Sequence, residues 1–297
     1  MDLPRQLGPY RLLRRLGHGG MAEVFLAVAH GASGFEKHVA LKTLLPELQG
    51  DGEYERILIE EARRAASFQH RNLVGVHDLG LAGGVYFVRM DWVDGADLSA
   101  LLARSRPPVP LALMVAEELA HALAYLHGLA DDAGRALGLV HRDVSPANVL
   151  LSRAGDVKLG DFGIAKATHL AEVTRGSARK GKYAYMSPEQ VTGAPLTAAS
   201  DQFSLGITLC ELLTGARPFD ADSPLETMER VREARAPDLS ALDVDLAAVL
   251  GRCLARAPAQ RFADAGALAK ALATARRTRP PAGPEELAAW VRGALKG

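Results

Sequence analysis

His141–Leu150 reads HRDVSPANVL, and an Asp-Phe-Gly tripeptide at 161–163 begins thirteen residues beyond Asn148. The Asp143 carboxylate can accept a proton from a hydroxyl nucleophile. Asn148 and Asp161 offer the oxygen ligands that Mg²⁺ prefers. Each motif alone could be an ordinary loop or turn. Their joint occurrence, order and spacing favour a phosphoryl-transfer site in which a metal neutralises phosphate charge.

Two motifs upstream fit the same chemistry. LGHGGMAEV at 16–24 lies between two expected strands, so its glycines would let the backbone approach phosphates; a plain hairpin turn is the alternative. A dinucleotide-binding fingerprint fits poorly, because the segment joins strand to strand. Lys42 ends VALK in the next strand, where a lysine needs an anion, and Glu61 is the expected partner. The alternative is an edge-strand lysine that reaches water.

Hydrophobic periodicity divides the chain near 94–97. Before this boundary we expect a small, mostly antiparallel sheet with strands at 10–16, 22–30, 38–44, 73–80 and 85–93, and one helix at 55–68. After it we expect a long helix at 111–129, a β-rich segment at 139–164 and helices at 199–214, 225–234, 244–255 and 264–276.

A proline-rich linker at 276–284 leads to a short terminal helix. One face of this helix is apolar and predicts packing on the helical part of the chain; docking of a partner is the alternative. The residues of this face are Leu287, Trp290, Val291 and Leu295.

Composition narrows the class of protein. Hydrophobic residues make up 48% and charged residues 24% of the 297, with zero formal net charge, so a folded core is expected and a nucleic-acid partner is not. Cys210 and Cys253 lie far apart in apolar helical segments, which predicts buried free thiols and a reducing, cytoplasmic location. Neither a secretory signal nor a membrane span is expected.

Three further motifs complete the resemblance of the chain to a known family. YMSPEQ at 185–190, DQFSLG at 201–206 and PAQRF at 258–262 follow the glycine loop, VALK, HRD and DFG in order. Over about residues 8–275 the chain resembles the eukaryotic-like serine/threonine protein kinases of bacteria. The resemblance implies a bilobal α+β fold. A sheet-rich N-lobe would cover about 8–93, a hinge about 91–95 and a mainly helical C-lobe about 96–275, with 276–297 beyond the domain.

The resemblance also implies ATP and Mg²⁺ as cofactors, proteins as substrates, transfer of the γ-phosphoryl group to serine or threonine, and autophosphorylation. Lys42, paired with Glu61, would hold the α- and β-phosphates. Asp143 would orient the substrate hydroxyl, and Asn148 and Asp161 would bind magnesium. The sequence indicates neither the protein substrate nor the oligomeric state.

Other positions take roles from the same resemblance. The glycine loop would cover ATP with Leu16, Gly17, His18, Gly19 and Gly20. Adenine would lie among Val24, Ala40, Leu150, the gatekeeper Met90 and the hinge residues Asp91, Trp92 and Val93, with Asp97 near the ribose. Structural roles would fall to Asp201, which braces the catalytic loop, to the pair Glu189 and Arg261, and to a stack of Ala65, Val76, His141 and Phe162. Arg142 would pair with a phosphate on Thr168, Thr174 or Ser177.

The chain departs from the family at two linked positions. Ser145 replaces the lysine of the catalytic loop, and Ala147 follows where a glutamate is usual. Lys182 stands where the family has the threonine before Tyr-Met. We therefore expect that Lys182 supplies the missing charge near Asp143 and Ser145 the hydroxyl; the alternative is that Lys182 points to solvent. A pseudokinase scaffold is the second functional reading, and a tyrosine kinase a weaker one.

Overall fold

The computed structural model describes residues 3, 5–161, 182–235 and 237–296, with only the backbone of Lys182. The described residues form two compact units. Of the described residues, the first unit contains those up to 70 together with 74–92, and the second contains 71–73, 93–161 and those from 182 onward. The boundary between Trp92 and Val93 lies close to the change in composition near Gly95.

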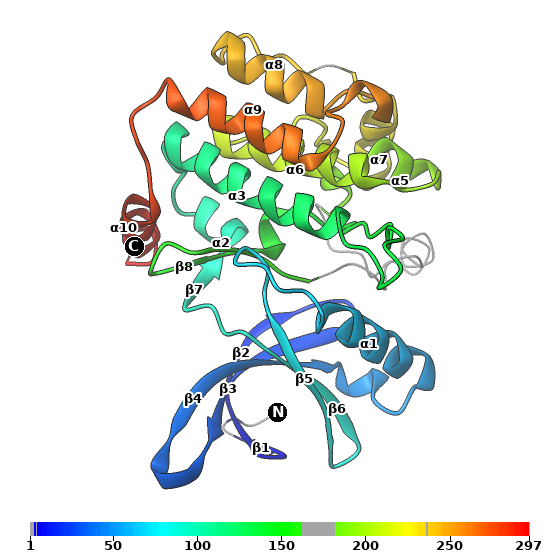
Figure 1. Ribbon diagram of the computed structural model, residues 1–297, viewed down its shortest axis with the longest axis vertical. Helices are drawn as coiled ribbons and strands as arrows, with labels where there is room; N and C mark the ends of the chain where they lie inside the picture. The colour runs from blue at the N-terminus through cyan, green and yellow to red at the C-terminus, as the bar shows by residue number, and fades with distance from the viewer. Residues whose placement is uncertain (1–2, 4, 162–181, 236, 297) are drawn as a thin grey trace. The chain divides into compact units, whose positions relative to one another are not determined.

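In its described residues, the first unit is a six-stranded antiparallel sheet with one α-helix (Figure 1). The strand order is β1-β2-β3-β4-β6-β5. The strands are β1 (Arg5–Leu7), β2 (Tyr10–His18), β3 (Ala22–His30), β4 (Glu36–Leu44), β5 (Val76–Ala82) and β6 (Val85–Met90), and the helix is α1 (Gly52–Ala65). The short strand β1 is the one strand of this sheet that the sequence pattern does not predict.

Alternation along β4 gives this sheet two buried faces. Val39 and Leu41 pack on one face in a cluster with Phe87. Leu44, on the other face, packs with Leu58 of α1. Because side chains alternate along a strand, Lys42 shares its face with Leu44 and therefore looks toward α1.

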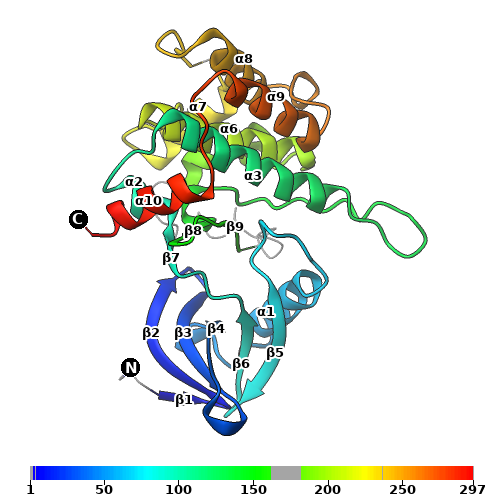
Figure 2. The same cartoon turned by 60° about the vertical axis from the view of Figure 1, so that its left-hand side comes forward.

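The second unit is mainly helical, as expected (Figures 1 and 2). Its helices are α2 (Leu98–Leu102), α3 (Val109–His127), α5 (Pro188–Thr192), α6 (Ala198–Thr214), α7 (Pro224–Glu233), α8 (Val244–Cys253), α9 (Ala265–Arg277) and α10 (Pro284–Ala294). A three-stranded sheet joins them in the order β7-β8-β9, with β7 (Gly95–Asp97), β8 (Val149–Ser152) and β9 (Val157–Leu159). The segment expected to be β-rich at 139–164 thus contains only two short strands among its described residues.

Helix α6 forms the centre of this unit, because nearly all of its side chains from Ser200 to Leu213 are buried. Phe203 and Ile207 pack there with Phe219 and Val231. A helix that is buried on nearly all sides is typical of the interior of a large domain.

One described helix, α3, is long and apolar enough to cross a membrane. One such helix is weak evidence for a membrane span. Most of α3 is buried inside the helical unit, which is typical of a core helix.

The two cysteines are free and buried, as the sequence predicts. Burial raises the pKa of the Cys253 thiol to about 12, so this thiol stays protonated near neutral pH.

We predict opposite effects for two glycine substitutions. A Cβ on Gly95 would lie 1.8 Å from the Leu151 carbonyl oxygen, across the β7–β8 pair. Gly95→Ala should therefore lower the free energy of unfolding by about 2–4 kcal/mol. Gly251 of α8 has no atom within 4 Å of its Cβ position. Gly251→Ala should raise that free energy by up to about 1 kcal/mol, because alanine is the better helix former. Urea unfolding of both variants checks this; equal effects would contradict it.

Candidate active site

In the first unit, the expected pair of Lys42 and Glu61 is present. Lys42 Nζ donates a hydrogen bond to Glu61 Oε1 at 2.7 Å, and both side chains are nearly buried, with 11% and 12% of their surface exposed. Asp51 caps α1 by accepting the amide of Glu53, and this fixes the start of the helix that carries Glu61. The strand alternation and the helix cap together place a partly desolvated ammonium and carboxylate side by side.

The glycine turn of the same unit is short. Strand β2 runs to His18 and β3 begins at Ala22, and the Gly19 amide closes the turn on the Ala22 carbonyl at 2.7 Å. The Cβ position of Gly17 has no atom within 4 Å. A ligand could therefore approach the backbone at Gly17 closely, whereas a Cβ on Gly19 would press against the turn itself.

In the second unit, Asn148 holds Asp143. Its Nδ2 donates to Asp143 Oδ2 at 2.7 Å and to the Asp143 carbonyl at 2.8 Å. Asn148 ends a single 3-10 turn, Pro146–Asn148, whose amide at Asn148 bonds to the Ser145 carbonyl. Asn148 thus fixes both the side chain and the backbone of Asp143, the residue whose carboxylate could orient a hydroxyl.

A backbone hydrogen bond at the same turn brings the chain just before Asp161 to Asn148. The Gly160 amide donates to the Asn148 carbonyl at 2.9 Å, which places Asp161 next along the chain. Asp161 is exposed, and it adopts a positive φ of 51°, a conformation that aspartate tolerates better than most residues. Because Nδ2 of Asn148 is used on Asp143, its Oδ1 is the atom left to contact a cation.

This donor set fits magnesium. Among the described residues there is no group of three or more His, Cys, Asp or Glu side chains that could hold a metal. Magnesium in phosphoryl-transfer sites commonly needs only one or two protein oxygens, because substrate phosphates and water supply the others. Asn148 and Asp161 offer such a pair.

Asp201, in the first turn of α6, braces the catalytic loop as expected. Its Oδ2 accepts the His141 amide at 2.7 Å, and its Oδ1 accepts the Arg142 amide at 2.8 Å. His127 Nε2 lies 2.8 Å from Oδ2 and must carry the proton there, because a carboxylate only accepts. Arg142 has a positive φ of 67°, so this carboxylate holds a backbone turn that would be unfavourable by itself.

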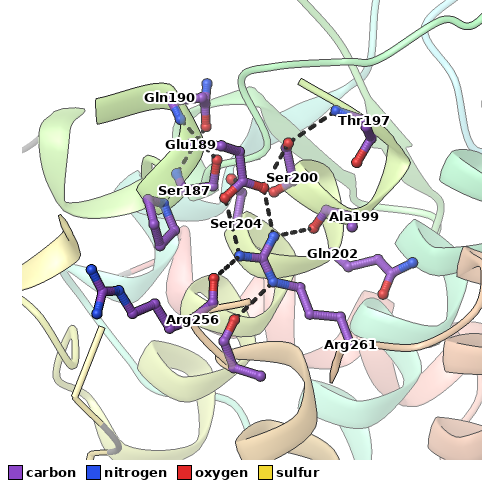
Figure 3. A network of polar contacts seen from close by, with 12 residues as sticks. Ser187, Glu189, Gln190, Thr197, Ala199, Ser200, Gln202, Ser204, Arg256 and Arg261 are labelled. Atoms are coloured by element: carbon purple, nitrogen blue, oxygen red, sulfur yellow. Dashed lines mark hydrogen bonds and ion pairs between the residues drawn. The ribbon is translucent and has the colours of Figure 1, made fainter. Parts of the chain in front are cut away.

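The expected pair of Glu189 and Arg261 is deeply buried (Figure 3). Arg261 Nη1 and Nη2 donate to the two carboxylate oxygens at 2.6 and 3.1 Å, and Ser200 Oγ donates to Oε1 at 2.8 Å. The remaining guanidinium donors reach the carbonyls of Ala199, Ala255 and Arg256. Burial alone would raise the pKa of Glu189, but the hydrogen bonds and charge of Arg261 outweigh it and lower that pKa.

The residues expected around adenine and ribose already make contacts of their own. Asp91 accepts the Gly75 amide at 3.0 Å and bonds His77 at 2.7 Å, and its own amide donates to the Gly75 carbonyl at 2.8 Å. Trp92 lies with its ring centroid 4.9 Å from that of His38. Asp97 caps α2 by accepting the Ala100 amide.

The other expected positions lie on defined elements. In the first unit, Leu16 and His18 lie on β2, Val24 on β3, Ala40 on β4 and Met90 at the end of β6, while Gly20 lies in the glycine turn. In the second unit, Val93 follows the unit boundary and Leu150 lies on β8 opposite Asp97. Ala65 and His141 are buried and Val76 is half-buried.

Several predicted positions lie outside the described residues. These are Phe162 and Gly163, the candidate phosphorylation sites Thr168, Thr174 and Ser177, and the side chain of Lys182. Ser145 is buried, with 8% of its surface exposed. The exchange of Ser145 and Lys182 therefore stays a prediction.

Nε of Arg142 is buried and makes no hydrogen bond within the described part of the chain.

Comparison with known proteins decides the family. Residues 10–273 match the family model of the protein kinase domain. The chain belongs to the protein kinase family. Its relatives include the tyrosine-protein kinase MasK of Myxococcus xanthus, 40% identical over 287 residues. The serine/threonine-protein kinases PknD and PknA of Mycobacterium tuberculosis are 37% and 35% identical over 278 and 286 residues.

This kinase domain is only part of the length of those relatives. The alignments cover 92%, 89% and 94% of the chain, but 44%, 39% and 64% of MasK, PknD and PknA. The crystal structure of the Mycobacterium tuberculosis PknI kinase domain is similar, with a TM-score of 0.66, 33% identity, and coverage of 92% of this chain and 98% of that one. The bilobal α+β kinase fold is thereby confirmed.

Three supporting residues of this kinase were not predicted. His127 reaches Asp201 from the end of α3, and Ser200 joins Glu189 from the residue before Asp201. Gln190 Nε2 donates to the Arg142 carbonyl at 2.9 Å. The position of Gln190 beside Glu189 was the one available signal, whereas the other two contacts depend on where distant helices meet.

We predict that removal of Arg261 destabilises this kinase strongly. Arg261→Ala would leave the Glu189 carboxylate buried without its charge partner and should cost about 3–5 kcal/mol in the free energy of unfolding. Arg261→Lys should recover part of that loss, because one ammonium cannot reproduce the forked contacts. Urea unfolding monitored by circular dichroism measures both.

Arg230 provides the matched control. It pairs with Glu226 on the surface of α7, and Arg230→Ala should change stability by less than about 1 kcal/mol. If the Arg261 and Arg230 variants lost similar stability, the central role given to the buried pair would be wrong.

Proposed function

We propose that this domain is an active serine/threonine protein kinase, which transfers the γ-phosphoryl group of Mg·ATP to protein hydroxyls and to its own chain. The observation that carries the proposal is the hydrogen-bonded group of Asp143 and Asn148 with Asp161 next to it. A scaffold without catalysis would have no need to keep a carboxylate, its amide partner and a second carboxylate in this order.

Each group has a definite part in the proposed reaction. Mg·ATP, when bound, supplies the phosphoryl group and the metal charge that offsets the negative charge on its oxygens. Asn148 Oδ1 and Asp161 would hold the metal, and Asp143 would accept the hydrogen bond of the acceptor hydroxyl and later its proton. In the first unit, Glu61 fixes the position of Lys42, which would contact the α- and β-phosphates.

The choice of serine and threonine rests on resemblance. The segments SPANVL and YMSPEQ are similar to the serine/threonine pattern, and PknD and PknA carry that name. Tyrosine is the second candidate, because the similar MasK is named a tyrosine-protein kinase. Acid hydrolysis of the phosphorylated domain, followed by separation of phosphoserine, phosphothreonine and phosphotyrosine, distinguishes the two.

We also propose a cytoplasmic location, supported by the free thiols.

We predict that Asp143→Asn abolishes phosphotransfer and leaves nucleotide binding intact. Loss of the proton acceptor should lower kcat by at least about a hundredfold, while the amide keeps a hydrogen-bonding group near Asn148. Incorporation of labelled phosphate from ATP measures the loss, and Mg·ADP titration measures binding. Asp132→Asn, on an exposed loop residue, is the control and should behave like wild type. Residual activity in Asp143→Asn close to that of the control would refute the proposal.

We predict that Lys182 and Ser145 act as a pair. If Lys182 supplies the charge usually placed at 145, Lys182→Ala and Lys182→Thr should each lower kcat about a hundredfold. The double variant Ser145→Lys with Lys182→Thr restores the usual arrangement and should recover much of the activity. Lys180→Ala, from the same basic run, is the control. Near wild-type activity in both single variants at 182 would contradict the prediction that Lys182 and Ser145 act as a pair.

A further inference from the structure

The C-terminal helix α10 lies beyond the part of the chain that matches the kinase family model, which ends at residue 273. Its apolar side is turned inward: Leu287, Ala288, Val291 and Ala294 are all buried. Its exposed residues are Pro284, Glu285, Glu286, Ala289, Arg292 and Gly293. The packing on the helical unit expected from sequence is therefore observed for Leu287 and Val291, whereas Trp290 and Leu295 of the expected face are only half-buried. The buried part of this side is already covered and is not open to a partner.

Helix α10 contacts the turn between β8 and β9 at two points. Arg292 Nη1 donates to the Arg153 carbonyl at 2.7 Å. The Pro284 carbonyl lies so close to Gly155 that a Cβ built on this glycine would be 1.9 Å from the oxygen. Gly155 also has a φ of +93°, so both its backbone conformation and its neighbour require glycine. Figure 1 shows α10 beside β8 in this position.

A third contact joins the end of α10 to the segment after α2. Arg104 Nη1 donates to the Ala294 carbonyl at 3.1 Å, one of the carbonyls that a helix end leaves without an internal partner. Figure 2 shows α10 beside α2. The helix is thus attached at its first residue, Pro284, and at two points in its last turn, Arg292 and Ala294, to the segments that surround the small sheet.

The turn that α10 contacts also holds the chain next to the unit boundary. The Arg153 amide donates to the Asp94 carbonyl at 2.7 Å, and Arg153 Nε lies 3.5 Å from Asp94 Oδ1. From there β7 pairs with β8, with Asp97 opposite Leu150. Both residues are expected to contact the nucleotide, and β8 begins immediately after Asn148, an expected metal ligand.

We propose that α10 is a positioning element for nucleotide binding, which acts through Arg292 and Gly155 on the β8–β9 turn and through Arg153 on Asp94 and β7. The proposal rests on the ATP-dependent function proposed above. Loosening α10 lets the sheet β7-β8-β9 shift, so it weakens the hold on Mg·ATP while the catalytic group at Asp143 stays braced by Asp201. The expected signature is a higher KM for ATP with kcat nearly unchanged.

The test compares Arg292→Ala and Gly155→Ala with two controls in the whole chain. Gly134→Ala places a Cβ on another glycine of positive φ, 75°, that has no atom within 4 Å. Arg292→Lys keeps a donor for the Arg153 carbonyl. Hydrogen exchange of the amides at 94–97, measured without nucleotide, should quicken about tenfold in the two test variants and stay unchanged in Gly134→Ala. Arg292→Lys should stay near wild type.

Nucleotide affinity provides the second arm. The dissociation constant of Mg·ADP and the KM for ATP should both rise about three- to tenfold in the test variants, with kcat within about twofold of wild type. If hydrogen exchange at 94–97 were unchanged in the test variants, the inference that α10 holds this segment would be wrong. If exchange were faster but the affinity for nucleotide unchanged, α10 would have no role in nucleotide binding. Absence of Mg·ADP binding by the wild type would instead reject the proposed function, and the exchange arm would still decide whether α10 holds this sheet.

Discussion

One buried carboxylate, that of Asp201, holds the backbone on which the catalytic residues lie. It is 1% exposed and accepts the amides of His141 and Arg142 and the ring of His127. A buried charge is tolerated only when donors surround it. The backbone in turn depends on this carboxylate, because an unfavourable backbone conformation persists only where the surrounding structure fixes it. Without this carboxylate the turn at Arg142 would be free to relax, and Asp143 would move with it.

Backbone strain is concentrated at this site. Four non-glycine residues described in the structure have positive φ, and two of them belong to this site: Arg142 precedes Asp143, and Asp161 is an expected metal ligand. Each such residue costs about 1–3 kcal/mol. The hydrogen bond that Asp201 accepts from the Arg142 amide and the bond from the Gly160 amide to the Asn148 carbonyl offset this cost. The domain thus uses stability from its helical core to fix side chains where chemistry is proposed.

The sequence predicts those features that depend on local spacing. The alternation of β4 explains why Lys42 meets Glu61, and the short 3-10 turn explains why Asn148 meets Asp143. Contacts made by distant helices are beyond such reasoning, because nothing in the residues around His127 indicates that Asp201 lies beside it. Elements of three to five residues, such as β1 and α2, are too short for a periodic signal.

Two adjacent residues in the first turn of α6 face different partners. Ser200 donates to Glu189, while Asp201 accepts from the catalytic loop. Successive residues on a helix are separated by about 100°, so both contacts depend on the same rotational setting of α6. Inserting or deleting one residue here would turn both side chains away from their partners at once. The loop around Gly134, exposed and bonded mainly to itself, has no such restriction. Homologous domains should therefore vary in length at that loop and keep a constant length at the start of α6.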